Sequence, residues 1–382
     1  MELTARTGYQ MGKSPILPLF AASIGVGASM SGAIIATSAA TGLITSPLIG
    51  ALSDRYGRFQ PLLLGTLLFA FTPLVYLAVQ TPAQLIVVRL GHGLATAIYG
   101  PIITAAVTDS YPRHRGEAIG WYRSARTASY LLGPALGGAV LLYTDPRTAW
   151  VAVGVLGCLG FIPGAILAPR LRLPRRANQR TTTYRNLRRS LSEGVRDPVI
   201  MKLGIAQIAL YASLRANSAF LPLWAIAHGL HPSQIGLILG GQVLATLLAQ
   251  PIAGRLAGKI GDRASVGAGL LLVGFGLVLA GTRFDLPALT IAATALGIGE
   301  AAIAPVVSAA ATRTTIGRSY GGRLGLLEAT DNIGKVLGPL TAGVLIATLG
   351  HPSAYVILAC LVVAVSVAFF SKFRMARPTL EV

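Results

Sequence analysis

The chain has 382 residues, of which 53% are hydrophobic and 12% are charged, whereas soluble proteins carry roughly 25% charged residues. A mean hydropathy of +0.65 excludes a predominantly soluble protein and indicates that most of the chain lies in a membrane. The net charge of +19 would suit a nucleic-acid-binding protein. The basic residues form no folded module interleaved with aromatic residues, however, which argues against that class.

The first candidate helix, residues 1–22, begins with a polar stretch. Glu2, Arg6, Gln10 and Lys13 precede the apolar residues that end it. A secretory signal peptide also has a charged start and a short apolar run, but this segment matches the start of the second half of the chain, which argues against a signal peptide. We therefore expect a first membrane helix that is short or truncated.

Apolar stretches of the length that crosses a bilayer as a helix, about 20 residues, follow along the rest of the chain. In the first half they cover 31–52, 60–80, 83–108, 118–142 and 148–169. In the second half they cover 199–225, 233–256, 264–282, 287–311, 322–349 and 353–371. We therefore predict an all-α membrane protein with eleven clear spans besides the first.

The two halves of the chain repeat the same glycines and prolines at a shift of 204 residues. The matched pairs are Pro18 with Pro222, Gly32 with Gly236, Gly50 with Gly254 and Pro101 with Pro305. Internal symmetry of this kind, together with high hydropathy, is typical of transporters whose substrate site lies between two related halves.

The basic residues gather in the segment 169–197, which holds nine arginines and two acidic residues. The short loops on the other side hold only Arg147 and Arg283, each close to an aspartate. Because positively charged loops remain in the cytoplasm, we expect this segment to be a cytoplasmic linker and both termini to be cytoplasmic. The predicted domains are an N-terminal bundle at 1–168, the linker, and a C-terminal bundle at 198–382 with a short cytoplasmic tail.

Residues 50–59, GALSDRYGRF, lie between the second and third spans. They resemble motif A of the major facilitator superfamily at every defining position. In that family the aspartate and the arginines latch the two bundles at the cytoplasmic face, so the resemblance implies this role for Asp54, Arg55 and Arg58. The second copy has Gly258 in place of the aspartate, so we expect the first latch to dominate.

The fifth span contains Gly133, Pro134, Gly137 and Gly138. With Gly120 and Ser129, the latter in place of a glycine, they resemble motif C of the drug:proton antiporter branch of the same superfamily. Small residues allow close helix packing, and proline bends a helix because it removes one backbone hydrogen bond. The resemblance favours export over uptake, although the same features could serve packing alone.

The fourth span contains Arg89 and His92 in a sequence that resembles motif B of the superfamily. An arginine inside a membrane usually faces a cavity or a partner, so Arg89 is a candidate for coupling or substrate contact, or for a structural tie to a neighbouring helix. His92 could carry a proton at physiological pH, or it could simply be packed.

Opposite charges occupy matched positions of the fifth and eleventh spans. At a shift of 205 residues, Arg123 and Arg126 fall on Glu328 and Asp331. Our hypothesis is that they belong to polar networks between the bundles that govern closure of the cytoplasmic side. Alternatively, they bind a charged substrate, take part in proton coupling, or pair locally, as Asp331 with Lys335.

Glu300 is the most isolated deep acid, about halfway along the tenth span. A carboxylate without a partner at that depth would tend to be protonated, which suits proton exchange or substrate contact; a structural hydrogen bond is the alternative. Arg215, in the seventh span, is another deep charge and a possible partner, but the sequence does not pair them.

The chain lacks the motifs of an enzyme, namely a nucleotide-binding glycine loop with its lysine, clustered metal ligands, or a nucleophile spaced with its base. We therefore predict no catalysis, no cofactor and no metal. Without an ATP site, the energy for transport must come from a gradient.

The resemblance to the twelve-helix drug:proton antiporter branch implies two pseudo-symmetric six-helix bundles that rock about a midplane site. It implies efflux of a small amphiphilic compound in exchange for protons, by a monomer in a bacterial plasma or inner membrane. An uptake symporter or facilitator for a sugar or metabolite is the alternative within transport. A non-transporting receptor or scaffold is the alternative of another class. The sequence does not identify the substrate or settle the direction of transport.

Overall fold

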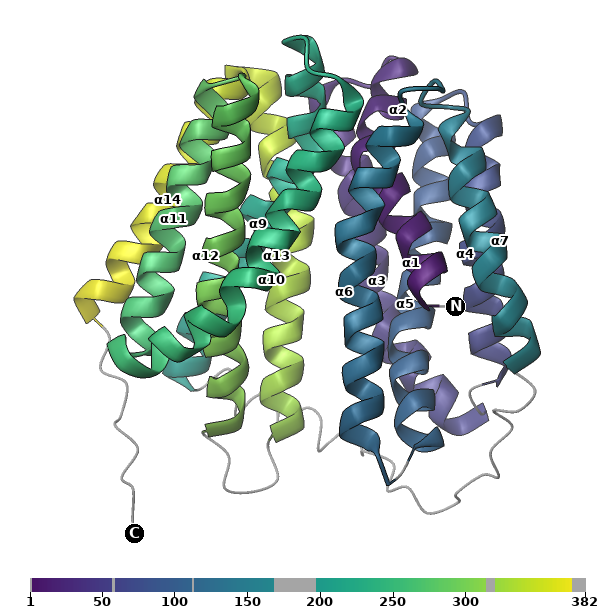
Figure 1. Cartoon of the computed structure of the whole chain (residues 1–382), viewed down its shortest axis with the longest axis horizontal. Helices are drawn as coiled ribbons and strands as arrows, with labels where there is room; N and C mark the ends of the chain where they lie inside the picture. The colour runs from purple at the N-terminus through teal and green to yellow at the C-terminus, as the bar shows by residue number, and fades with distance from the viewer. Residues whose placement is uncertain (1, 57–58, 112, 168–196, 314–319, 373–382) are drawn as a thin grey trace.

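The computed structural model describes residues 2–56, 59–111, 113–167, 197–313 and 320–372. Within these ranges the chain forms helices and contains no strand, which confirms the all-α prediction. The helices form two bundles that stand side by side, one from each half of the chain (Figure 1).

The helices of the N-terminal bundle are α1 (Glu2–Met11), the π-helix η1 (Gly12–Ile16), α2 (Leu17–Ser23), α3 (Ala28–Tyr56), α4 (Phe59–Val75), the 3-10 helix η2 (Tyr76–Ala78), α5 (Pro82–Ser110), α6 (Arg115–Val140) and α7 (Ala149–Leu167). Those of the C-terminal bundle are α9 (Pro198–Ala227), α10 (Pro232–Ile260), α11 (Asp262–Thr282), α12 (Leu286–Arg313), α13 (Tyr320–Leu349) and α14 (His351–Lys372).

Ten helices in the described ranges are long and apolar enough to cross a membrane: α3, α4 with η2, α5, α7 and α9 to α14. The helix α6 has 26 residues, which is also sufficient, but its arginines make it less apolar. The eleven clear spans of the sequence prediction correspond to these ten helices and α6. Helices satisfy their backbone hydrogen bonds internally, which is why they can cross a bilayer.

The first span is interrupted at Ser14, where the backbone is extended with φ −160° and ψ 125°. Pro15 follows and cannot donate a backbone hydrogen bond to the preceding turn. Ser14 Oγ donates a 2.9 Å hydrogen bond to the carbonyl of Ser218 in α9, so the interruption connects the two bundles. Glu2, at the start of α1, is buried, and the cytoplasmic position of both termini stays a prediction.

The internal repeat is visible in matched turns and contacts. Gly25 and Gly229, which are 204 residues apart, adopt positive φ angles of 79° and 85° after the first helix of each half. Glycine adopts this conformation without steric cost. Ser14 and Ser218 are also 204 residues apart, so matched residues of the two halves meet at the interface.

Glycines bring the two bundles together at one end of the molecule, which we call the glycine end. A Cβ atom at Gly138 of α6 would collide with the carbonyl of Pro232 in α10, and one at Gly32 of α3 would collide with the carbonyl of Pro339 in α13. Only glycine permits backbones to approach this closely. The end where α7 ends and α9 begins is called the linker end.

The other residues of the motif in α6 pack against the first span. A Cβ atom at Gly133 would collide with Gln10, and one at Gly137 would press on the carbonyl of Met11 at 3.0 Å. Pro134 lies between them, and its carbonyl faces α10. The motif thus places α6 in close contact with α1 on one side and with α10 on the other.

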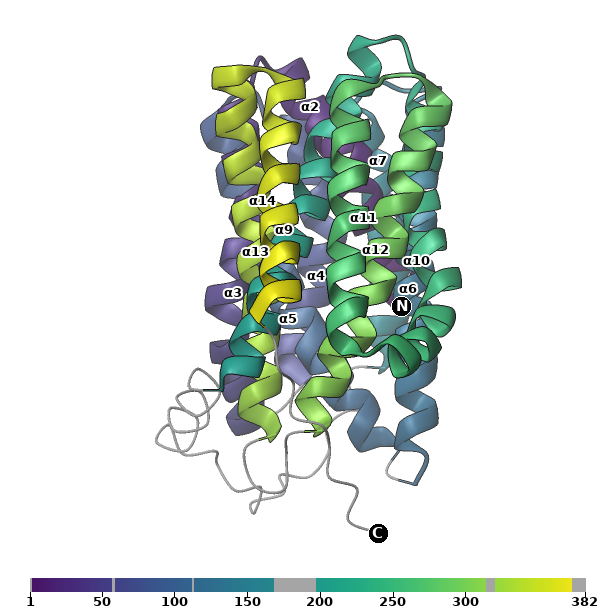
Figure 2. The same ribbon diagram turned by 90° about the vertical axis from the view of Figure 1, so that its left-hand side faces the viewer.

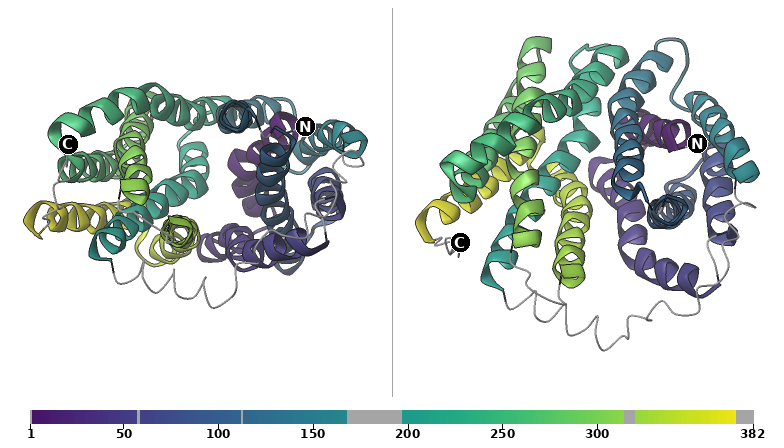
Figure 3. Two further views of the ribbon diagram at one scale, coloured as in Figure 1. Left: turned by 90° about the horizontal axis from the view of Figure 1, so that it is seen from below. Right: turned by 60° about the horizontal axis from the view of Figure 1, so that its bottom comes forward.

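The two bundles converge toward the glycine end and diverge toward the linker end (Figure 1, Figure 3). Their helices run along one common direction, which is clearest after a quarter turn (Figure 2). In the described ranges, the glycine contacts between the bundles lie in the last part of α6 and α13 and the first part of α3 and α10. The interface is therefore tightest at one end.

We predict that alanine at Gly236 destabilises the protein, because its Cβ would collide with the carbonyl of Pro134. Overpacking of this kind costs on the order of 1–3 kcal/mol, which would lower the melting temperature of the purified protein in detergent. Gly241→Ala in the same helix is the matched control, because no atom lies within 4 Å of its Cβ position. It should leave the melting temperature unchanged or raise it, since alanine favours helix. Equal melting temperatures for the two variants would contradict the proposed role of the glycine contact.

Candidate functional site

A cavity of about 360 Å³ lies between the two bundles. Residues of α1, η1 and α6 line it from the N-terminal bundle, and residues of α9, α10, α12 and α13 line it from the C-terminal bundle. The charged residues that line it are Lys13, Arg126, Arg215, Glu300, Asp331 and Lys335. Its volume falls within the range of small-molecule sites, about 300–1,000 Å³. Both halves of the chain therefore build one candidate binding site.

Glu300 lies at the middle of α12 and lines the cavity. Its carboxylate Oε2 accepts a 3.3 Å hydrogen bond from Thr246 Oγ1 of α10. Among the charged side chains, Arg215 of α9 acts most strongly on this carboxylate. The structure thus brings together the two deep charges that the sequence could not pair.

Glu300 of the C-terminal bundle has no acidic residue at the matched position of the N-terminal bundle. At the 204-residue shift, Glu300 and Thr246 correspond to Thr96 and Gly42. The latter two are also close, because a Cβ at Gly42 would lie 4.0 Å from Thr96 Oγ1. The matched position in the first half therefore carries a hydroxyl where the second half carries a carboxylate.

Asp331 and Lys335 form an ion pair within α13. Lys335 Nζ lies 2.6 Å from Asp331 Oδ2, and their side chains are 24% and 21% exposed. Lys335 Nζ also lies 5.3 Å from the centroid of the Tyr211 ring. The local pairing that the sequence offered as an alternative is therefore present, and both partners line the cavity.

Lys13 is a cavity residue that sequence reasoning missed. The sequence identifies it only as part of a polar helix start. It lies in η1 next to the interruption at Ser14, and its side chain lines the cavity. The signal that could have identified it is the proline two positions later, because an interrupted membrane helix exposes its residues to a cavity.

Arg126 lines the cavity together with Tyr130, one turn away in α6. Arg123 and Glu328 are exposed and do not line the cavity. In the described part of the chain, no ion pair joins the two arginines of α6 to Glu328 or Asp331. In this conformation the bundles are apart at the linker end. The polar network between the bundles therefore stays a prediction for a conformation in which that end is closed.

Arg89 and His92 do not line the cavity. The Arg89 guanidinium, 1% exposed, donates hydrogen bonds to the carbonyls of Ile34 and Ile35 at 3.2 and 3.1 Å. It thereby connects α5 to α3.

His92 Nδ1 lies 3.3 Å from the Tyr76 hydroxyl. Its ring packs edge-on against Tyr9 and Phe69, with centroid distances of 4.9 and 6.0 Å. The structure therefore places this histidine in an aromatic cluster within the N-terminal bundle.

The predicted cytoplasmic latch lies at the limit of the described residues. Asp54 and Arg55 belong to the last turns of α3, but the positions of their side chains are not described. Arg58 lies outside the described residues. Their role therefore stays a prediction.

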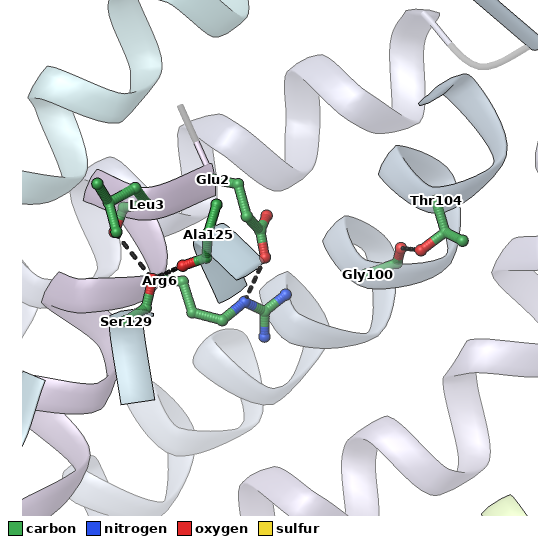
Figure 4. Close-up of polar contacts among 7 residues, drawn as sticks. All are labelled: Glu2, Leu3, Arg6, Gly100, Thr104, Ala125 and Ser129. Atoms are coloured by element: carbon green, nitrogen blue, oxygen red, sulfur yellow. Dashed lines mark hydrogen bonds and ion pairs between the residues drawn. The ribbon is translucent and has the colours of Figure 1, made fainter. Parts of the chain in front are cut away.

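A second polar cluster lies inside the N-terminal bundle, where α1 meets α6 (Figure 4). Arg6 Nε and Glu2 Oε1 form an ion pair at 2.7 Å, with side chains 5% and 9% exposed. Ser129 Oγ of α6 donates hydrogen bonds to the carbonyls of Leu3 and Ala125 at 3.2 and 2.9 Å. The polar start that the sequence could not explain is thus a buried ion pair of α1, packed against α6.

Comparisons with known proteins agree with this architecture. A curated relative from Methanocaldococcus jannaschii, an uncharacterized MFS-type transporter, is 23% identical over 366 residues, covering 95% of this chain and 94% of that protein. Quinolone resistance protein NorA of Staphylococcus aureus is 23% identical over 334 residues, covering 87% and 84%. The crystal structure of the nucleoside transporter NupG superimposes with a TM-score of 0.79 at 14% identity, covering 98% of this chain and 99% of that chain.

The sequence profile of the Major Facilitator Superfamily matches residues 8–214 and again residues 203–381. The two matches correspond to the two bundles and together cover nearly the whole chain. Hydropathy, the internal repeat, the two bundles and the cavity between them all point to the same assignment. The chain belongs to the Major Facilitator Superfamily of transporters.

Proposed function

We propose that the protein is a proton-coupled secondary transporter that exports a small amphiphilic compound by alternating access. The observation that carries this proposal is the position of Glu300, a carboxylate on the wall of a cavity that both bundles form. Its carboxylate accepts a hydrogen bond from Thr246, and Arg215 lines the same cavity. A group so placed can exchange a proton and change the charge of the cavity wall when it does so.

The movement we propose is a rocking of the two bundles. They touch through glycines at one end and diverge at the other, so exchanging the open and closed ends exposes the cavity to each side in turn. Protonation of Glu300 would leave Arg215 without its opposite charge. The proton thus alters how strongly the cavity holds a charged compound, which is the linkage that coupled transport requires.

Export is supported by the glycine motif of α6 and by the likeness to NorA, whose name states quinolone resistance. The arginine-rich segment between the bundles supports a cytoplasmic position for the linker end. We propose a monomer in a bacterial inner membrane, with its linker and C-terminal tail in the cytoplasm.

Uptake is a second candidate, favoured by the proximity of Arg215 to Glu300. An anion bound at Arg215 would repel the ionised form of Glu300 and favour its protonation. The proton and the anion would then move in the same direction. The other charged or titratable groups acting on Glu300 are Asp331 and Lys335 of α13 and Tyr211 of α9.

We predict that Glu300→Gln abolishes proton-coupled transport although the variant still binds its substrate. Inside-out vesicles from expressing cells are energised until their interior is acidic, and norfloxacin, a quinolone, is added as the probe. For export, the wild-type protein should release protons from the vesicles, as reported by a fluorescent pH probe, and Glu300→Gln should not. Glu117→Gln, an exposed acid at the start of α6, should behave as the wild type.

The sign of the proton movement separates the candidate functions. Proton release on adding the compound supports antiport, and uptake of the compound together with protons supports symport. Coupling through Glu300 is refuted if the Glu300→Gln variant moves protons at the wild-type rate. A panel of toxic compounds is then tested on vesicles that contain the folded protein. If none of the compounds causes proton movement, the result supports a non-transporting scaffold.

We also predict that Arg89 contributes to stability and not to coupling. Arg89→Leu removes its two hydrogen bonds to α3 and should lower stability by on the order of 1–3 kcal/mol, measured as a lower melting temperature. His92→Phe, which keeps the ring contacts, should leave the pH dependence of transport unchanged. A shifted pH profile in either variant would reassign these residues to coupling.

A further inference from the structure

We propose that the substrate carries a carboxylate or another oxyanion, and that Lys13, Arg126 and Arg215 bind this group. The inference rests on the proposed transport function of the cavity and specifies the chemistry of its substrate. With Glu300 as the coupling group it fits the uptake candidate, in which the proton and the anion move in the same direction.

The charges of the cavity wall are unequal. Four basic and two acidic side chains line it. Asp331 is already paired with Lys335 at 2.6 Å, so Glu300 is the one remaining acid among the lining residues to compensate three cations. Uncompensated charge is costly in a membrane protein interior. A ligand with a negative group would supply the missing charge.

None of the three cations forms an ion pair within the described part of the chain. Arg215 Nε is buried and has no hydrogen-bond acceptor. Lys13 lines the same cavity as Arg126 and Arg215. Cations held near one another without an acceptor are the arrangement expected of an anion site.

The three residues come from both bundles and from three helices. Lys13 lies at the interruption of the first span, Arg126 in α6 and Arg215 in α9. An anion between them would therefore contact both halves of the transporter. Arginine binds planar oxyanions through two parallel hydrogen bonds, whereas lysine acts as a point charge.

The rest of the cavity wall suits the apolar part of an amphiphile. Leu239, Val243 and Leu247 line it from α10 and Leu214 from α9. Tyr130 and Tyr211 present aromatic rings on opposite bundles, and aromatic rings contribute large apolar contact areas. An aromatic acid has the combination of groups that this wall would recognise.

Binding of matched compounds to the purified full-length protein in detergent tests the proposal. The probes are two aromatic series, each with an acid, an amide and an amine: phenylbutyrate, phenylbutyramide and phenylbutylamine, and naphthylacetate, naphthylacetamide and naphthylethylamine. Binding is measured by isothermal titration calorimetry at neutral pH. We expect the acid to bind about tenfold more tightly than the amide or amine in at least one series.

Substitutions locate the binding group. Lys13→Gln, Arg126→Gln and Arg215→Gln should each weaken binding of the acid about tenfold and leave the amide unaffected. Lys13→Arg and Arg215→Lys retain the charge and should retain the preference. Glu300→Gln should strengthen binding of the acid, because it removes the competing negative charge.

Arg123→Gln is the matched control for the net charge of the protein, because Arg123 lies on the same helix as Arg126 but is exposed and does not line the cavity. It should bind the acid as the wild type does. Each variant is checked by size exclusion and by its melting temperature. If a variant does not fold, the comparison rests on the other two cavity variants.

The proposal is overturned if no acid in either series binds, if an amide or amine binds as tightly as its acid, or if Arg123→Gln weakens binding as much as the cavity variants. Binding and transport can fail separately. A preference for acids without proton-linked flux would refute the proposed function and leave the anion site intact, whereas proton-linked flux without that preference would refute the anion site alone.

Discussion

The cost of holding a charge inside a membrane protein governs how this chain is arranged. Most of the deep charges are neutralised within one helix or one bundle. Glu2 pairs with Arg6 one turn away, Asp331 pairs with Lys335 in the same way, and Arg89 donates to two backbone carbonyls of α3. These charges find their partners within one helix or one bundle, so the contacts do not depend on how the two bundles meet.

The exceptions face the cavity between the bundles. Arg215 has a buried nitrogen without an acceptor, and Glu300 has a single hydrogen bond, to Thr246, with Arg215 as its main opposite charge. Glu2 Oε2 and Arg6 Nη2 are also buried without a hydrogen-bond partner, but the charges of these two residues are paired with each other. At the cavity the charges themselves lack full compensation, and a proton and a substrate can supply it. Elsewhere in the bundles, the cost of a buried charge is offset by a partner within the protein. At the cavity, the same cost favours binding of a substrate and makes that binding depend on the protonation of Glu300.

Backbone contact between glycines allows the bundles to separate without repacking large side chains. Gly32 lies against Gly343, and Gly236 lies against Gly138. Gly32 matches Gly236 at the 204-residue shift, and Gly138 matches Gly343 at a shift of 205, so the two contacts are copies of one another. A pseudo-symmetric pair of small contacts fits the proposal that the two halves move as bodies about the cavity.

Hydropathy and the repeat were sufficient to predict the helical spans and the two bundles, because both depend on which residues occur along the chain. The predicted close packing of small residues holds for Gly133, Gly137 and Gly138, whereas no atom lies within 4 Å of a Cβ position at Gly120 of the same motif. The site was predictable only in part: Glu300 and Arg215 line the cavity, whereas Arg89 and His92, equally deep, do not. Lys13 was missed because the interruption at Ser14 determines where it points. The tertiary structure decided these cases, because the side of a helix that faces a cavity depends on the neighbouring helices that cover its other sides.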